Sequence, residues 1–449
     1  MSSTKKYVIV GAGISGVSAA VLLAQREPDA EIEVWEASKQ AGGLLAPVPF
    51  CEVECDRGSH RIHPKADPLL LSMTRQQKWL ERPRRGMLIL NQKHIAYPPN
   101  PVGFLRGLGT RTSLHMGIGF LRRPRTFRRF LSWEKARGDA SAHDEGFKDF
   151  VIERVGVAAY EAFYRPYVEK VWGLDPADIS RTVAKQRVST SSPWETLLGA
   201  IRSGKGKQVR HFLYPTKGMA DLIHALRDKA QQLDVQFRYT RKVDGSTAAD
   251  IDASAILFSG HLSDISDLPA LNHRGLYLLH LAFEEGATRE VDTFYSPESK
   301  YWFGRVSQLE HFSPALKATG KHILCMEIPE GEWGKDVDFL ARLGTIRQQL
   351  VDAGIVRADA PIIDAKQTFL PRVYPMYTRD WLKNWQDAME KVRRLERVYP
   401  FGRQGLFLHC NIDHCVRMAD VAVEHVSRGD SAENWLAETS QFLDLRVRD

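Results

Sequence analysis

The stretch YVIVGAGISG at residues 7–16 decides how this chain begins to fold. Its apolar residues 7–10 predict a short buried strand, and glycines follow with the spacing GxGxxG. In this pattern Gly11 allows a tight turn, Gly13 lets the backbone approach a pyrophosphate, and Gly16 lets the next helix pack closely on the strand. Free N–H groups at the start of that helix would bind the phosphates. The stretch therefore predicts a dinucleotide site.

The residues that follow complete the context that this motif needs. A helical apolar pattern covers residues 17–25, and a second strand at 31–35 ends at Glu36, 25 residues after Gly11. A carboxylate at this point can accept hydrogen bonds from the adenosine ribose hydroxyls. Strand, glycine turn, helix and second strand together indicate a Rossmann-like unit, so we set aside the alternative of a glycine-rich turn without a ligand.

Two further segments bear on which dinucleotide binds. The sequence EASKQAGGL at 36–44 adds a second glycine pair, and DRGSH follows at 56–60. Here the chain resembles the two-dinucleotide-binding-domain flavoproteins of the flavin amine oxidase class. In that family the Gly-Gly segment passes along the diphosphate and the D-x-G-x-H segment approaches the flavin ring. The resemblance implies FAD as the cofactor, with contacts from Gly11, Gly13, Ile14, Ser15, Gly16, Glu36, Ala37, Gly42, Gly43, Leu44, Gly58, Ser59, His60, Val243, Gly402, Arg403, Asn411 and Asp413.

The resemblance extends over nearly the whole chain. Segments 166–173, 214–219 and 312–314 are similar to the bacterial protoporphyrinogen-oxidase-like branch of the family, which is close to UDP-galactopyranose mutase. It implies an α/β fold (α+β overall) with a discontinuous FAD-binding domain and an inserted substrate domain that is part helical and part antiparallel sheet. We expect the FAD domain at 1–75, 210–268 and 396–449, and the substrate domain at 76–209 and 269–395.

Patterning predicts several individual elements. Alternating apolar residues indicate antiparallel strands between about 276 and 329. The apolar run at 255–259 predicts a further strand, buried in the core. Residues 402–408 predict a strand that enters a closing helix from about 413 to 426.

Four residues are candidates for chemistry: Arg61, His63, Arg305 and Tyr374. Arg61 and His63 belong to HRIH at 60–63, where a cation would stabilise reduced flavin and a histidine could relay a proton. The alternative is that His60 bonds backbone and His63 caps a helix. An arginine on a buried strand needs an anionic partner, which for Arg305 is either the substrate or an internal carboxylate.

Other candidates have equally plain alternatives. Arg372 also lies on a predicted buried strand, so its anionic partner is again either the substrate or an internal carboxylate. Tyr374 and Tyr377 would wall a cavity or belong to the core, and the block Tyr167, Lys170 and Trp172 would either floor the substrate site or pack in the core.

The predicted function is transfer of a hydride from a C–C or C–N bond of a small or lipid-like substrate to flavin N5, with O2 as acceptor. The main alternative is a redox-neutral sugar-nucleotide mutase resembling UDP-galactopyranose mutase. A third is a flavoprotein that serves only as a binding subunit. The partial glycine pattern at 107–110 follows no core strand, so no separate nicotinamide domain is expected.

The distribution of charge along the chain limits which classes of binding partner are expected. The net charge is +7, yet residues 82–133 hold eleven basic and no acidic residues, so the remainder sums to 7 − 11 = −4. The basic 104–131 region suits peripheral contact with anionic lipid, steering of an anionic substrate, or a solvated face. No nucleic-acid module accompanies it, and no nucleic-acid partner is expected.

The remaining composition is that of an ordinary globular chain, with 43% hydrophobic and 26% charged residues. No run of about 18 apolar residues occurs, and the first residues lack a secretory signal. Five cysteines without a CxxC pair predict reduced thiols in the cytoplasm, and no metal site is expected. The oligomeric state is left open.

Overall fold

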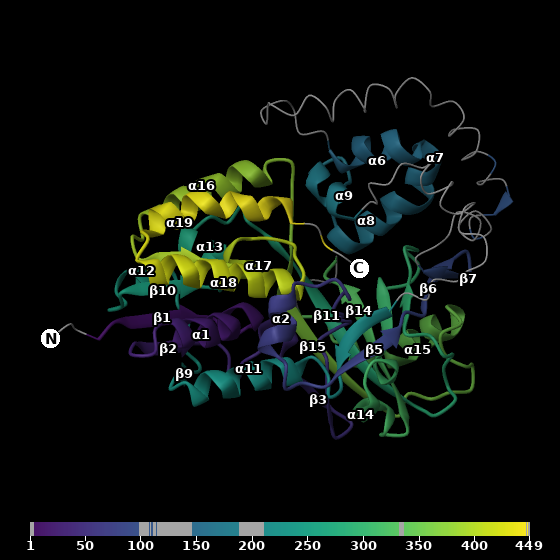
Figure 1. Cartoon of the computed structure of the whole chain (residues 1–449). Coiled ribbons are helices and arrows are strands. Elements are labelled where there is room, and N and C mark those ends of the chain that lie inside the picture. The colour runs from purple at the N-terminus through teal and green to yellow at the C-terminus, as the bar shows by residue number, and fades with distance from the viewer. Residues whose placement is uncertain are drawn as a thin grey trace.

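Two sheets lie side by side in the computed structural model of the chain (Figure 1). The structure describes residues 4–97, 107, 109, 110, 114, 146–187, 211–331, 336–445 and 447. The N-terminal segment and the end of the chain both contribute to one half, whose purple, teal and yellow elements lie on the left of the view, and the described chain ends near the centre.

The first sheet has five parallel strands in the order β16-β10-β1-β2-β9. Because both faces of such a sheet are covered by helices, its central strands are mostly apolar, and the four residues Tyr7 to Val10 are all buried. The strands come from three distant parts of the chain: β1 (Lys6–Val10), β2 (Glu31–Trp35), β9 (Gln236–Arg238), β10 (Ala255–Phe258) and β16 (Val398–Pro400). This topology confirms the predicted Rossmann-like fold.

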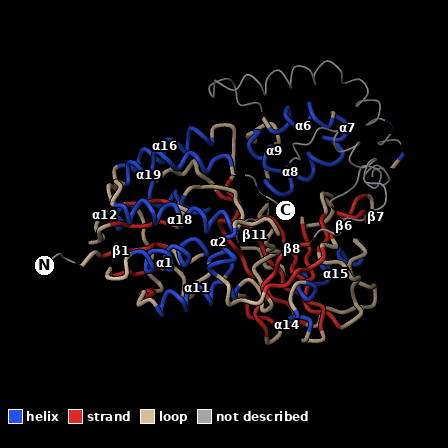
Figure 2. The backbone as a smooth tube through the Cα atoms, in the orientation of Figure 1, coloured by secondary structure: helices blue, strands red, loops and turns tan. Residues whose placement is uncertain are grey.

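Helix α1 (Ile14–Arg26) packs between α18 (Ile412–Arg428) and α11 (Ala220–Gln232) on this sheet. Every residue of α1 from Ile14 to Ala24 is buried, which fixes the glycine turn against the sheet edge. The other helices on this half are α12 (Gly245–Ala249), α13 (Leu262–Ser266), α16 (Trp381–Arg393), α17 (Gly402–Gly405) and α19 (Ala432–Glu438). Figure 2 shows them in blue around the red strands.

The second sheet has seven strands in the order β15-β11-β14-β13-β12-β6-β7, antiparallel except between β12 and β6. Helix α15 (Leu343–Asp352) buries Ile346 and Leu350 against it. This confirms the antiparallel strands predicted between 276 and 329. The strands are β6 (Gly86–Leu90), β7 (Lys93–Tyr97), β11 (His273–Glu284), β12 (Thr293–Tyr295), β13 (Arg305–Gln308), β14 (Lys321–Pro329) and β15 (Asp364–Pro375).

Smaller elements join the two halves. Hairpin β3 (Val48–Phe50) and β4 (Val53–Cys55) follows the second glycine pair, and β5 (Trp79–Pro83) pairs with β8 (His211–Pro215). A group of short helices lies at the upper right of Figure 1. The remaining helices are α2 (Pro68–Met73), α6 (Phe147–Val155), α7 (Val157–Ala159), α8 (Arg165–Trp172), α9 (Arg181–Arg187) and α14 (Pro314–Lys317), with a π-helical turn at Tyr160–Tyr164.

The strand predicted at 402–408 is wrong. The strand lies earlier, at β16, and the chain then turns through the short helix α17 and an irregular buried segment. Gly402 (φ +77°) and Phe407 (φ +52°) both adopt left-handed backbone, which ends strand geometry. The apolar run that suggested a strand is buried beneath α18 instead, and a short apolar run does not distinguish these two cases. The closing helix is confirmed as α18.

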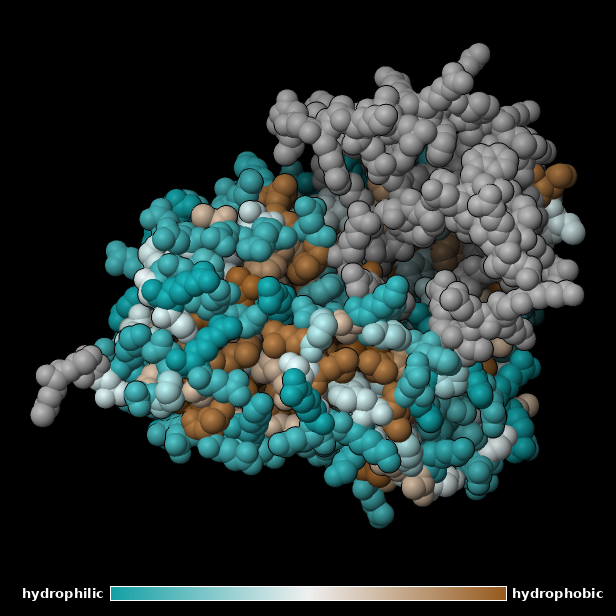
Figure 3. Space-filling view, in the orientation of Figure 1, coloured by the Kyte–Doolittle hydropathy of each residue, from teal (hydrophilic) through white to brown (hydrophobic). Residues whose placement is uncertain are grey.

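Among the described residues no helix is both long enough and apolar enough to cross a membrane. Figure 3 shows hydrophilic residues over most of the described surface on this face, with hydrophobic ones gathered in a band across its middle. The basic 104–131 region lies almost entirely outside the described residues. The predicted domain boundaries stay a prediction. Helix α16 falls in the segment assigned to the substrate domain, but it packs on α13 and α19, which fall in segments assigned to the FAD domain.

Candidate functional site

A cavity of about 980 Å³ runs from the glycine turn to the seven-stranded sheet. Its lining comes from both halves of the molecule, and it brings together residues far apart in the sequence. Among the predicted site residues it is lined by Gly11, Gly13, Ile14, Ser15, Glu36, Ala37, Gly42, Gly43, Leu44, Gly58, Ser59, His60, Arg61, His63, Val243, Arg305, Tyr374, Arg403 and Asn411. Gly16, Gly402 and Asp413 are not part of the lining.

The glycine turn has the geometry that the motif predicts. Gly11 has φ +95°, and a Cβ on Gly16 would lie 1.8 Å from the carbonyl oxygen of Gly11. A Cβ on Gly13, in contrast, would meet nothing closer than the Cα of Gly43 at 4.0 Å. Helix α1 has no side-chain cap at its N-terminus, so its first N–H groups face the cavity without a side-chain partner. Two glycines thus serve helix packing, and Gly13 leaves space for a ligand.

Glu36 closes the far end of the turn. Its carboxylate accepts hydrogen bonds from the backbone N–H of Ala12 (2.7 Å) and of Ser38 (2.8 Å). Beside it, the guanidinium of Arg241 stacks 3.3 Å from the ring centroid of Trp35. A carboxylate has further lone pairs, so the predicted ribose contact is compatible with these bonds and stays a prediction.

The second glycine pair lies directly against the first turn. The N–H of Gly42 donates to the carbonyl of Ala12 (2.8 Å), and Arg57 donates from Nη1 to the carbonyl of Gly43 (3.0 Å). Within the described part of the chain, Nε of Arg57 and Oγ of Ser59 are buried without a hydrogen-bond partner, and both residues line the cavity. Buried polar groups of this kind need a partner.

The DRGSH segment is held in place by Asp56. Its carboxylate is buried and accepts hydrogen bonds from the hydroxyl of Tyr214 (2.5 Å) and the N–H of Met219 (3.0 Å). The backbone carbonyl of Asp56 accepts a third bond from Nε2 of His280 (3.0 Å). Burial raises the pKa of Asp56 to about 6, although the two bonds to its carboxylate oppose the shift.

The raised pKa of Asp56 predicts a pH-dependent stability difference. The folded protein binds a proton at Asp56 more tightly than the unfolded chain, so this contribution is present below about pH 4 and is lost as the pH rises through about 6. We expect the unfolding free energy of wild type relative to Asp56→Asn to fall by about 3 kcal/mol between about pH 3 and pH 7, with most of the change between pH 4 and 6. Urea unfolding of both proteins at several pH values measures this, and a constant difference would contradict it.

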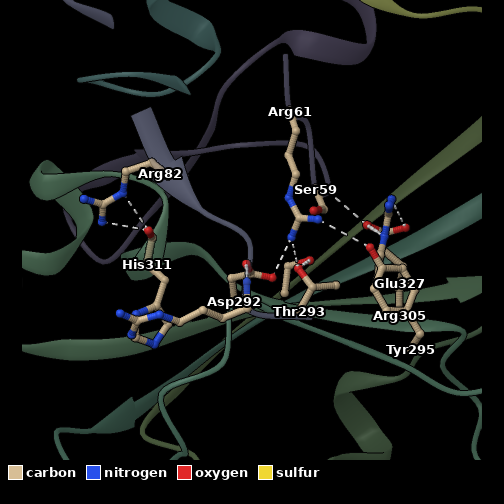
Figure 4. A network of polar contacts seen from close by, with 11 residues as sticks. Ser59, Arg61, Arg82, Asp292, Thr293, Tyr295, Arg305, His311 and Glu327 are labelled. Carbon is tan, nitrogen blue, oxygen red and sulfur yellow. Dashed lines mark hydrogen bonds and ion pairs between the residues drawn. The ribbon is translucent and has the colours of Figure 1, made fainter. Parts of the chain in front are cut away.

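Arg305 and Glu327 form a bidentate ion pair next to Ser59 (Figure 4). Arg305 donates from Nε and Nη2 to the two carboxylate oxygens at 2.8 and 2.7 Å, and the N–H of Ser59 adds a bond of 3.1 Å. Glu327 lies on β14, where its side chain is only 4% exposed. Of the two partners considered for Arg305, the structure shows the internal carboxylate.

Arg61 is bound within the protein on the other side of this network (Figure 4). Its Nη2 pairs with Asp292 at 2.8 Å and also bonds to the hydroxyl of Thr293. Its guanidinium lies 4.9 Å from the ring centre of Phe212 and 5.0 Å from that of Phe312. These contacts anchor the segment to the second sheet, and the predicted role at a flavin stays a prediction.

The two histidines of HRIH differ in environment. His60 donates from Nε2 to the carbonyl of Arg57 (2.9 Å), and burial with nearby Arg305 lowers its pKa to about 4, so it is neutral at pH 7. His63 lines the cavity, and its Nδ1 accepts a bond from the N–H of Lys65 (3.0 Å). His60 is therefore the backbone-bonding residue of the alternative interpretation. His63 lines the cavity and bonds within the turn before α2, whose cap is Asp67 and not His63.

Several other candidates belong to the interior. Tyr167, Lys170, Trp172 and Tyr377 do not line the cavity. The ammonium of Lys170 donates to three backbone carbonyls, those of Ser296, Glu298 and Phe303, and burial lowers its pKa to about 7.

Trp172 supports the cavity wall from behind, with its ring 5.7 Å from that of Tyr374. Tyr377 is buried and donates to the carbonyl of Phe407 (3.1 Å). Arg372 lines the cavity and is paired with Asp264 at 2.6 Å, again an internal carboxylate.

Sequence reasoning did not include Arg57, Glu327 or His409 among the site residues. A buried acid inside the apolar strand at 321–329 was the available signal for Glu327. No cluster of potential metal ligands occurs within the described residues.

Fold and site together define a Rossmann-like chain whose two-part fold is similar to that of solved flavin amine oxidase-like proteins. A family described as "NAD(P)-binding Rossmann-like domain" matches residues 9–76. That match covers the end of β1, the glycine turn, α1, β2 and the DRGSH segment.

Individual relatives agree with this class. Protoporphyrinogen oxidase 2, chloroplastic/mitochondrial, of Arabidopsis thaliana is 27% identical over 186 residues, which is 40% of this chain and 34% of the relative, so the match spans about a third of that protein. Reduced UDP-galactopyranose mutase is 17% identical with a TM-score of 0.77 over 98% of this chain and 99% of its own. Cyclohexylamine oxidase from Brevibacterium oxydans IH-35A is 15% identical with a TM-score of 0.61 over 95% and 99%.

Proposed function

We propose that the protein is an FAD-dependent oxidoreductase that accepts a hydride from a C–C or C–N bond of a small or lipid-like substrate. The observation that carries the proposal is the continuous cavity, which joins the glycine turn at Gly13 to Arg305 and Tyr374 on the seven-stranded sheet. One end suits a dinucleotide and the other suits a substrate.

The residues present fit FAD. The open space beside Gly13 and the uncapped start of α1 suit a diphosphate, and the buried Nε of Arg57 and Oγ of Ser59 offer donors that lack partners in the described chain. When bound, FAD would supply the hydride-accepting centre. Glu36 would hold the ribose, and the segment from Gly58 to His60 would border the flavin.

The chain's own residues would shape the substrate end. Arg305 is held by Glu327, so its position is fixed while its charge is largely balanced. Tyr374 is backed by Trp172 and forms a wall that limits access by water. His63 lines the cavity and would relay a proton near neutral pH.

A flavin reduction experiment tests the proposal. The purified protein should show flavin absorbance at about 450 nm, and anaerobic addition of substrate should bleach this absorbance. Because the substrate class is open, fractionated small-molecule and lipid extracts serve as the first source, with mass spectrometry of co-purifying ligands to guide the choice. Reoxidation by O2 should then release one peroxide for each flavin reduced. A protein that binds no flavin would contradict the proposal.

The likeness to UDP-galactopyranose mutase over nearly the full length of both chains favours one second candidate, a redox-neutral sugar-nucleotide mutase. This enzyme would be active only after reduction with dithionite and would form no peroxide during turnover. The same preparation therefore separates the two functions.

A further inference from the structure

Two cysteines lie in contact on the wall of the cavity. Cys410 precedes α18 and Cys415 lies in its first turns, and their sulfur atoms are 3.7 Å apart. The residues are only 8% and 4% exposed, and both line the cavity. Neither belongs to a disulfide. Closing the gap to the roughly 2.0 Å of a disulfide needs a shift of less than about 2 Å.

The surroundings favour different protonation states for the two sulfurs. The hydrogen bond between the two sulfurs lowers the pKa of Cys415 to about 7; burial opposes this shift, while Ser15 and Arg403 act in the same direction as the bond. Cys410 keeps its proton, because that bond and its burial raise its pKa well above the usual range. Cys415 is thus the attacking sulfur of the pair and Cys410 the resolving one.

We propose that Cys410 and Cys415 form a dithiol that a hydroperoxide entering the cavity oxidises to an intramolecular disulfide. Access favours a hydroperoxide over a bulky disulfide compound, because both sulfurs are almost fully buried and border the space that a cofactor would share. The proposed oxidase function would produce hydrogen peroxide in the same cavity. The inference rests on that function only for the source of the oxidant.

The chemistry balances in two steps. The Cys415 thiolate attacks one oxygen of hydrogen peroxide, so that an S–O bond forms, the O–O bond breaks and hydroxide leaves; sulfur loses two electrons. Cys410 then attacks the sulfur of Cys415, so that the S–S bond forms and the S–O bond breaks. The Cys410 proton and one solvent proton convert the two leaving hydroxides to water. In total, two thiols and one hydrogen peroxide give one disulfide and two water molecules.

Peptide mass spectrometry tests this directly. Trypsin cuts after Arg403 and Arg417, so both cysteines fall in the single peptide 404–417. The purified protein, with its cofactor as isolated, is reduced, freed of reductant and treated with hydrogen peroxide, then denatured in N-ethylmaleimide. We expect peptide 404–417 to become about 2 Da lighter and to resist alkylation, while Cys51 is alkylated as in the untreated sample. Reduction with dithiothreitol should restore two alkylation sites.

Single substitutions separate the two roles. Cys410→Ser should stop at the sulfenic acid of Cys415, which dimedone traps, and Cys415→Ser should leave Cys410 unoxidised at the same dose. Cys410→Ala and Cys415→Ala serve as second variants where serine lowers expression. The inference is overturned if peptide 404–417 of the wild-type protein still carries two alkylated thiols after peroxide treatment, or if Cys415 proceeds to the sulfinic acid without a disulfide. Since peroxide is added from outside, these results do not depend on finding a substrate.

Discussion

Replacing Gly13 with alanine is expected to lower FAD affinity at least tenfold, about 1.4 kcal/mol, while the protein still folds. The added methyl group would project into the cavity where the backbone must approach the pyrophosphate, and it would meet no protein atom within less than 4.0 Å. Gly13 has φ −71°, which alanine adopts freely. As the cap residue of α1, alanine would cost less than about 1 kcal/mol of stability. Flavin content after purification and an FAD titration measure the loss.

Gly16→Ala is the matched control, because it carries the same change three residues later. Its methyl group would lie 1.8 Å from the carbonyl oxygen of Gly11, and both positions are backbone on packed elements. We expect this variant to lose about 3 kcal/mol or more of unfolding free energy even without flavin. If Gly13→Ala were purified with a full complement of flavin, the assignment of this turn to the diphosphate would be wrong.

Removing the carboxylate of Glu327 is the second substitution with a large expected effect. Glu327→Ala leaves the guanidinium of Arg305 without its partner in a buried setting, and it also frees the N–H of Ser59. Breaking one side of a buried ion pair costs about 3–5 kcal/mol. Because the side chain of Arg305 is 28% exposed, we expect a value near the lower end of that range. Urea unfolding monitored by tryptophan fluorescence measures it.

Two companion variants show whether the lost charge or the lost packing causes the destabilisation of Glu327→Ala. Glu327→Gln keeps one acceptor for Ser59 or Arg305 and should cost less than Glu327→Ala. The double variant Arg305→Met with Glu327→Leu removes both charges, so it should recover much of the lost stability, since a hydrophobic pair can replace a buried ion pair. A double variant no more stable than Glu327→Ala would show that the pair is not the source of the effect.

The ion pair also bears on the substrate end of the cavity. Glu327 balances the charge of Arg305 and holds it beside Ser59, while burial and the nearby guanidinium of Arg305 lower the pKa of His60 and keep it neutral. Of the two partners that the sequence left open for Arg305, the internal carboxylate holds it, so an anionic substrate would compete with Glu327 rather than meet an open charge.

The sequence by itself determined the first half of the site. The strand, glycine turn, helix and acid between Tyr7 and Glu36 interact mainly with their sequence neighbours, so spacing alone predicts their geometry. The closing helix predicted from about 413 to 426 is likewise confirmed, as α18 from Ile412 to Arg428.

Only the tertiary structure decided the partners of the buried charges. Glu327 lies 22 residues after Arg305, and the pairing of β13 with β14 places the two opposite each other. Asp292 lies 231 residues after Arg61, and only the tertiary packing brings that pair together. The segment at 402–408 was mispredicted for a related reason, because local apolarity does not show whether a buried stretch has strand pairing or only helix contacts. Local backbone preferences determine how an element begins, whereas contacts between distant strands determine which charges are neutralised and which residues face the cavity.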